Sequence, residues 1–297
     1  TLTALTLLPR LDKRDTYTAT YADAAVEGSR VGLFEGGVYT VDQLFQGLFL
    51  QSGNDTAHAL GELGGGQAQT ARAMNDVAAA LGATDTHAVN TSGLDQPGQV
   101  STAFDLAVIA RAGLAHKDFS AYAGQLEVDF PGRDGATYKI HNQNPLLDRY
   151  PGALGIKTGY TTQAGRTFVG AAERSGHRLV VTFMNTKSPT LEVAAALLDW
   201  GFAVRGTSRP VGNLADKPAV PEAGQSGQDA GGTDLPALAS PEIAQAGGQA
   251  AAAAGAVGDR WVPAWAWVLG ACGAALLAAS AGGILHVCRS RPRRLPS

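Results

Sequence analysis

Cysteine is scarce in this sequence, which has only Cys272 and Cys288 among its 297 residues. Both lie in a C-terminal apolar region, so the rest of the chain offers neither a disulfide framework nor a thiolate metal site. Their separation of 16 positions would be about 24 Å along one helix, which is too far for them to bond to each other. The folded part of the chain must therefore be held together by packing and hydrogen bonds.

Basic residues are also few, with 23 lysines and arginines against 26 aspartates and glutamates. The formal net charge is −3, and four of the 23 lysines and arginines lie among the last nine residues, namely Arg289, Arg291, Arg293 and Arg294. Because a nucleic-acid-binding protein needs a basic face for the phosphates, we expect no nucleic-acid partner. His58, His87 and His177 have no neighbour at metal-ligand spacing. We predict surface or core roles for them and no metal site.

A long stretch without charge lies near the C-terminal end. Residues 264–285 carry no charged side chain over 22 positions, about 33 Å of helix and enough to span a bilayer. Tryptophans precede this stretch and arginines follow it. The positive-inside rule then predicts one transmembrane helix over residues 261–288, a cytoplasmic basic tail over 289–297, and an extracellular domain anchored in the cell membrane. The alternative is a buried, alanine-rich core helix.

The segment before this apolar stretch has an unusual composition. Residues 206–260 are rich in Gly, Ala, Pro, Gln and Ser, with almost no large apolar side chains. Such a segment buries too little surface to offset its ordering entropy, so we predict a flexible linker after a domain at residues 1–205. An exported chain should begin with a signal peptide, yet the first residues are neither a methionine start nor a basic segment. We therefore expect this sequence to be a fragment of a longer protein.

The first 115 residues carry helical patterns. Thr40 followed by Gln43 forms a capping box, and the helix that it begins runs directly into Ser52. Gly82 is the C-cap predicted for a later helix. Helices are predicted for residues 1–8, from 40 to the polar residues at 52, from about 56, around 71–81 and from about 101 to 115.

After residue 115 the pattern changes to that of strands. Strands are predicted for residues 126–130, 136–140, 154–160, 166–173 and 177–185, followed by a helix over residues 191–202. Two glycine-containing turns join four of these strands into two hairpins. Leu197, Leu198 and Trp200 are the apolar side chains predicted for the last helix. Helices segregated from antiparallel strands indicate an α+β fold.

Two polar triplets interrupt these apolar elements. Ser52-Gly53-Asn54 follows an apolar helix, and Lys157-Thr158-Gly159 lies in an extended run about a hundred residues later. Each triplet alone is ordinary turn, cap or strand-end chemistry. Together, in this order and on these elements, they are typical of a cleft that binds a carboxylate-bearing amide substrate and catalyses acyl transfer.

Several further blocks accompany the triplets in register. They are residues 28–33, 39–41, 51–55, 74–75, 90–95, 101–106, 155–161 and 198–202. With these blocks, residues 1–205 resemble the serine-type D-alanyl-D-alanine carboxypeptidases, which are low-molecular-weight penicillin-binding proteins. The resemblance implies a β-lactamase/DD-peptidase-like fold in which helices flank an antiparallel sheet beside a mostly helical subdomain. It also implies peptidoglycan stem peptides as substrates, β-lactam antibiotics as ligands, and no cofactor.

Roles for the polar side chains follow from what acyl transfer requires. The hydroxyl of Ser52 can both accept and donate, which suits a relay of the proton to the departing amine. Asn54 suits a peptide amide on the acyl side of the substrate. Lys157 supplies positive charge that faces Ser52 and the substrate's terminal carboxylate, and Thr158 adds a hydroxyl to the same carboxylate.

The end of the second triplet involves the backbone. Gly159 allows close approach of the main chain, and the resemblance implies that the N–H of Tyr160 contributes to the oxyanion hole. Arg166 is a candidate to orient the cleft. Asn142 and Asn144 could touch the cleft, but turn chemistry at the end of a hairpin is at least as good an interpretation.

The sequence departs from the family in one respect. The family's nucleophile lies in a Ser-x-x-Lys motif ahead of the position of Thr1, and no such motif precedes Ser52 here. We expect the motif to lie upstream in the intact gene. Two alternatives stay open: a non-catalytic relative that binds peptidoglycan, and a serine β-lactamase. The β-lactamase is disfavoured because the Glu-x-x-Leu-Asn pattern of class A enzymes does not follow Ser52.

Overall fold

The computed structural model describes residues 1–214. Its helices are α1 (Leu2–Leu7), α2 (Tyr21–Ala24), α3 (Val41–Leu50), α4 (Asn54–Leu63), α5 (Gln67–Leu81), α6 (Ala103–Ala115), α7 (Lys117–Gly124) and α8 (Thr190–Val204), with a short 3-10 helix at Arg133–Gly135. Its strands are β1 (Thr16–Thr18), β2 (Val38–Thr40), β3 (Glu127–Pro131), β4 (Thr137–His141), β5 (Ala153–Thr161), β6 (Gly165–Arg174) and β7 (His177–Thr186).

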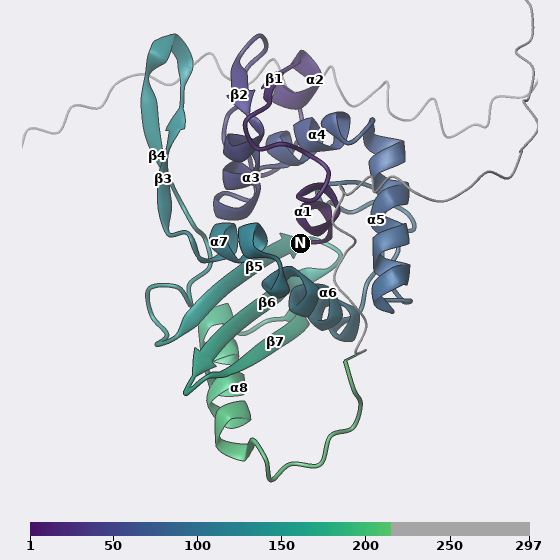
Figure 1. The fold of residues 1–297 in the computed structure, drawn as a ribbon, viewed down its shortest axis with the longest axis vertical. Coiled ribbons are helices and arrows are strands. Elements are labelled where there is room, and N and C mark those ends of the chain that lie inside the picture. Colours follow the sequence, from purple (N-terminus) through teal and green to yellow (C-terminus); the bar gives the residue numbers. More distant parts are fainter. Residues whose placement is uncertain (215–297) are drawn as a thin grey trace, which may run out of the picture. The chain divides into compact units, whose positions relative to one another are not determined.

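The largest sheet is antiparallel, in the order β5-β6-β7, and helices cover both of its faces (Figure 1). Side chains of β6 alternate between two cores. Phe168 and Ala172 join a cluster beneath α8, whereas Val169 and Ala171 join the larger core that includes α6 and α7. The other two sheets are the pairs β1–β2 and β3–β4. The predicted α+β architecture, with helices flanking an antiparallel sheet beside a mostly helical region, is confirmed.

The helix that leads to the first polar triplet begins where the sequence predicts. At the start of α3 the hydroxyl of Thr40 accepts from the N–H of Gln43 at 3.2 Å, and the Gln43 side chain accepts from the N–H of Thr40 at 2.9 Å. Leu44, Phe45 and Leu50 of this helix are completely buried. The capping box fixes the start of α3, and the buried stripe fixes the face that it turns to the core.

Aromatic packing connects α3 to α7. The ring of Phe49 lies 5.0 Å from that of Phe119 and 5.7 Å from that of Tyr122, and Phe45 also stacks on Tyr122 at 5.7 Å between centroids. Such pairs add about 0.5–1.5 kcal/mol each beyond the burial of their area. They hold the end of α3 against α7.

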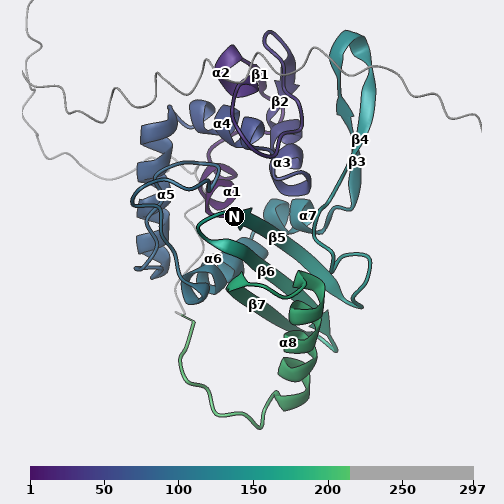
Figure 2. The same ribbon diagram turned by 180° about the vertical axis from the view of Figure 1, so that it is seen from behind.

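The same helix α7 also positions β5. Gly155 has φ +99°, and a Cβ there would lie 2.2 Å from the carbonyl oxygen of Ala123 in α7. Only glycine permits this approach, because any side chain would push the strand away from the helix. Helix α7 therefore sets the spacing between the end of α3 and strand β5. Figure 2 shows α7 beside β5 from the opposite side.

Some predicted elements differ from the structure. Helices α2 and α7 were not predicted, and α4 begins at Asn54 rather than near Thr56, because Gly53 already serves as its N-cap. In α8, Leu198 is buried but Leu197 and Trp200 are 40% and 62% exposed. The predicted helix is confirmed, but only Leu198 of these three apolar residues faces the core, since neighbours at 100° per residue point in different directions.

None of the helices within residues 1–214 is long and apolar enough to cross a membrane. The predicted transmembrane helix at 261–288, the basic tail at 289–297 and most of the linker at 206–260 lie outside the described residues.

Candidate active site

A cleft of about 850 Å³ opens between the helical region and the edge of the sheet that β5 forms. Most of its lining residues lie within the ranges 1–4, 28–29, 48–54, 86–101 and 157–169. The two polar triplets predicted from the sequence therefore meet in one cleft. Lining atoms come from α1, from the α3–α4 junction and from β5. Helix α7 packs against both the end of α3 and β5.

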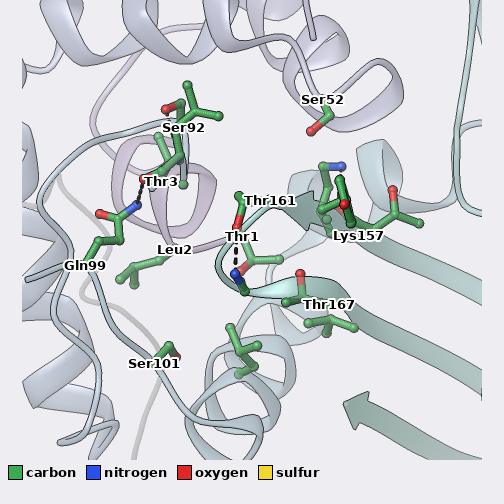
Figure 3. Close-up of a pocket in the computed structure, with 18 of the residues that line it drawn as sticks. Thr1, Leu2, Thr3, Ser52, Ser92, Gln99, Ser101, Lys157, Thr161 and Thr167 are labelled. Carbon is green, nitrogen blue, oxygen red and sulfur yellow. Dashed lines mark hydrogen bonds between the residues drawn. The ribbon is translucent and has the colours of Figure 1, made fainter. Parts of the chain in front are cut away.

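The first triplet forms the junction between α3 and α4. Ser52 has φ 55°, the left-handed region that a non-glycine residue adopts at a cost of about 1 kcal/mol or more. The next position needs glycine, because a Cβ on residue 53 would lie only 2.8 Å from side-chain oxygens of both Asp55 and Thr56. The Thr56 hydroxyl donates to the Gly53 carbonyl at 2.9 Å. This tight turn points the Ser52 side chain into the cleft (Figure 3).

Asn54 is held from behind by the loop before β2. Its backbone N–H donates to the carbonyl of Ser29 at 2.7 Å, and its side-chain amide donates to the carbonyl of Glu27, also at 2.7 Å. Gly28 lies between these two acceptors with φ +82°. With its N–H₂ group directed to Glu27, the side chain of Asn54 keeps its oxygen as an acceptor in the cleft wall.

Asp55 ties the same loop to the start of α4. Its carboxylate is completely buried and accepts from the N–H groups of Val31 at 3.1 Å, Gly32 at 2.8 Å and Leu33 at 3.0 Å. It also accepts from Thr56 N–H at 2.9 Å. Four donors around one carboxylate offset the cost of burying its charge. The loop that frames Asn54 is thereby fixed to the helix that carries it.

The second triplet lies on β5, across the cleft. The ammonium group of Lys157 and the hydroxyl of Ser52 point toward each other (Figure 3). Burial lowers the pKa of Lys157 to about 8, because a low-dielectric site disfavours the charged form. Its Nζ donates to the carbonyl of Thr158 at 2.9 Å. An amine with this pKa is largely protonated at neutral pH and loses its proton when the pH rises above the pKa.

The start of α1 also belongs to the cleft wall. Thr1 and Leu2 line the cleft together with Lys157. Thr3 anchors the helix by donating from its hydroxyl to the carbonyl of Thr91 at 2.7 Å. Residues joined to Thr1 at its amine would therefore enter the cleft beside Lys157.

The predicted site residues come together in the structure. Ser52, Asn54, Lys157, Thr158, Gly159, Tyr160 and Arg166 all line the cleft. Asn142 and Asn144 do not line it, and they serve the turn after β4. Asn142 donates to the carbonyls of Ala123 and Gln125, and the side chain of Asn144 accepts from the N–H of Leu146.

Gln143 and Asp95 are among the cleft residues that were not predicted as site residues. Gln143 lines the cleft and donates to the side chain of Gln51 at 3.1 Å. Asp95 reaches across to the β5–β6 turn and accepts from the hydroxyl of Thr162 and from the N–H of Gln163, both at 3.3 Å. Neither residue has a spacing signal, because each contact joins segments far apart in the chain. Within residues 1–214, no group of three or more His, Cys, Asp or Glu side chains could hold a metal ion.

The fold and the cleft define an acyl-transfer enzyme of the serine type, with a Ser-x-Asn turn facing a Lys-Thr-Gly strand. The sequence profile of peptidase family S11, described as D-alanyl-D-alanine carboxypeptidase, matches residues 9–188. The chain is 48% identical over 210 residues to the D-alanyl-D-alanine carboxypeptidase DacB2 of Mycobacterium tuberculosis, covering 68% of this chain and 72% of the relative. It is 28% identical to DacF of Bacillus subtilis and spans about half, 54%, of that longer protein.

Solved structures agree with these sequence relationships. A crystal structure of D-alanyl-D-alanine carboxypeptidase from Mycobacterium tuberculosis superposes with a TM-score of 0.67 at 47% identity, covering 69% of this chain and 80% of the other. The DD-transpeptidase of Streptomyces K15 superposes with a TM-score of 0.63 at 29% identity, covering 68% and 85%. The chain belongs to the serine-type D-alanyl-D-alanine carboxypeptidase family.

Proposed function

We propose that this protein removes the terminal D-alanine from peptidoglycan stem peptides through an acyl-enzyme, and that β-lactam antibiotics acylate the same site. The observation that carries the proposal is the meeting of Ser52 and Lys157 across one cleft (Figure 3). Family membership supports the reaction type, and the names of the relatives support the substrate.

The nucleophile in this proposal belongs to a Ser-x-x-Lys motif directly ahead of Thr1. A helix that continued α1 backwards would carry these residues into the cleft, because Thr1 at the start of α1 lines the cleft together with Lys157. The lysine lies three positions after the serine, so both side chains would lie on one face of that helix. The lysine would act as the base that activates the serine.

The remaining steps use residues of the described chain. The serine oxygen attacks the carbonyl carbon of the penultimate D-alanine, while the N–H of Tyr160 and the serine's own N–H stabilise the oxyanion. Ser52 passes a proton to the nitrogen of the terminal D-alanine, and the C–N bond breaks. Asn54 binds an amide on the acyl side. Water then cleaves the ester and returns the free serine.

The experiment that tests this proposal uses the full-length protein and a pentapeptide that ends in D-Ala-D-Ala. Release of one D-alanine per peptide, blocked by stoichiometric acylation with penicillin, is the expected result. Rapid turnover of penicillin without a lasting adduct would select the β-lactamase alternative. Binding of the peptide without release or acylation would select the non-catalytic relative.

We also propose that the protein is anchored in the cell membrane by residues 261–288, with residues 1–205 outside the cell as its catalytic domain and 206–260 as the linker. The support is the sequence alone: an uncharged stretch with tryptophans before it and arginines after it. Deleting residues 261–297 should move the protein from the membrane fraction to the medium. Retention of the shortened protein in the membrane fraction would contradict the anchor.

A further inference from the structure

A completely buried carboxylate, that of Asp23 in α2, lies outside the cleft lining. Its Oδ2 accepts from the hydroxyl of Tyr17 at 2.8 Å, and from the N–H and the hydroxyl of Thr20 at 2.7 and 2.8 Å. These donors are close to Asp23 in the chain. The other oxygen, Oδ1, lies 2.6 Å from Nδ1 of His58 in α4, 35 residues later. This contact joins α2 to the helix that begins at the first polar triplet (Figure 1).

The chemistry of this pair fixes which group donates the hydrogen bond. Burial by itself would raise the pKa of Asp23, but hydrogen bonds from His58 and Thr20 hold that pKa below its ordinary value. The carboxylate is therefore ionised at neutral pH and can only accept. Nδ1 of His58 carries the proton in either charge state of the ring, so the contact is a hydrogen bond whether or not the imidazole is charged.

His58 shares a face of α4 with Asn54. The two residues are four positions apart in this helix, which places one side chain a turn beyond the other. Asn54 is held by the carbonyls of Glu27 and Ser29, and His58 is held by Asp23. Segment 23–29 therefore contacts one face of α4 at two points. The first point holds a side chain that the proposed mechanism uses, whereas that mechanism gives the second point no role.

The loop that carries these two carbonyls depends on hydrogen bonds for its position. Residues 27–30 are exposed, so side-chain packing contributes little to holding them. On one side of the loop, the N–H groups of residues 31–33 donate to the carboxylate of Asp55. On the other side, Asp23 accepts from His58. Removing the imidazole would leave a buried carboxylate oxygen without its donor and would release this end of the loop from α4.

We propose that the hydrogen bond between His58 and Asp23 positions Asn54 for the acyl side of the substrate. By fixing α2 on α4, it places the carbonyls of Glu27 and Ser29 where they hold the backbone and the side-chain amide of Asn54. Because neither member of the pair lines the cleft, its effect on a ligand depends on what that ligand offers to Asn54. A ligand with an acyl-side amide needs the positioned side chain, and a ligand without one does not. This inference rests on the proposed function, because it takes a D-alanyl-D-alanine peptide or a β-lactam as the ligand of the cleft.

The test compares two β-lactams on the full-length protein: benzylpenicillin, which has an acylamino group beside the β-lactam carbonyl, and penicillanic acid, which lacks that group. His58→Ala should lower the second-order rate of acylation by benzylpenicillin about tenfold or more. On penicillanic acid the loss should be about twofold or less, because this ligand offers no amide to Asn54. His58→Asn should recover most of the loss, since asparagine supplies an N–H₂ donor near the position of Nδ1. His177→Ala, at an exposed histidine outside the cleft, is the matched control and should change neither rate.

An equal loss on both β-lactams, or no loss on either, would overturn the positioning role. Hydrogen exchange of the same proteins, read by mass spectrometry, answers the question even for a chain that penicillin does not acylate. His58→Ala should speed exchange at residues 20–31 and at the N–H of Asn54, which donates to Ser29, about tenfold or more, and should leave α6 unchanged. Faster exchange throughout the chain, or unchanged exchange in this segment, would overturn the inference. Absence of acylation of the wild type, with this local effect present, would overturn only the proposed function.

Discussion

The side-chain amide of Asn54 donates to the carbonyl oxygen of Glu27 at 2.7 Å. The contact joins the start of α4 to a loop 27 residues earlier in the chain. It directs the oxygen of the Asn54 amide away from the loop, as an acceptor for an N–H of the substrate's acyl side. Gly28 fills the space beside this contact, because a Cβ there would lie 2.6 Å from the Asn54 amide nitrogen.

Gly28→Ala should therefore impair acylation more than it impairs folding. The new methyl group must displace the Asn54 amide, so we expect the second-order rate of penicillin acylation to fall at least about tenfold. The control is Gly36→Ala. Gly36 has a similar φ of +78°, but a Cβ there would meet nothing within 4 Å. Both changes should cost about 1 kcal/mol in unfolding free energy. Equal acylation rates for the two variants would contradict the role of Asn54.

Ser52→Ala should slow the reaction without changing the fold. Loss of a proton relay typically costs about 10²- to 10⁴-fold in rate, and D-alanine release measures it. Ser29→Ala is the matched control, because Ser29 also lines the cleft but contributes its carbonyl oxygen to Asn54 rather than its hydroxyl. A Ser52→Ala rate within about threefold of the wild type would exclude the relay.

Asp55→Ala should destabilise the protein strongly. The change leaves the buried N–H groups of Val31, Gly32 and Leu33 without an acceptor, and we expect a loss of about 3 kcal/mol or more in the free energy of unfolding. Urea unfolding measures this loss. Asp76→Ala, at an exposed position of α5, should stay within about 0.5 kcal/mol of the wild type. Similar unfolding free energies for both variants would show that the buried carboxylate contributes nothing.

The rate should fall above the pKa of Lys157. Burial lowers this pKa to about 8, so the ammonium form exists below that pH and disappears above it. Because the proposed role of Lys157 needs its charge beside Ser52, kcat/KM should decrease about tenfold per unit above pH 8. A pH–rate profile measures the decrease, and Lys157→Arg should remove this limb. A profile that stays flat to pH 10 would contradict a charged role.

Local signals in the sequence predict much of the fold. The capping box at Thr40 and the left-handed C-cap at Gly82 lie where the pattern places them. Helix α7 was missed because its residues, Lys117–Gly124, form only a short helix, and a short segment carries too few repeats for a periodic pattern to stand out. Its place depends on tertiary contacts with Phe49 and with Gly155, which no window of the sequence reveals.

The site could be predicted only in part, because local motifs are visible in the sequence and contacts between distant segments are not. The Ser-x-Asn and Lys-Thr-Gly motifs identify Ser52 and Lys157 in the sequence, and the structure brings both residues to one cleft. The contacts of Asp55 with Val31 and of Asp95 with Thr162 join distant segments, so they depend on the register of the folded chain. The sequence suggests which side chains do chemistry, but not which buried groups hold them in position.

The most direct test of the central claim is to identify the residue that penicillin acylates. Full-length protein would be treated with penicillin, digested and mapped by mass spectrometry. The account predicts one adduct per chain, on a serine four residues ahead of Thr1. An adduct on Ser52, or no covalent adduct at all, would contradict it.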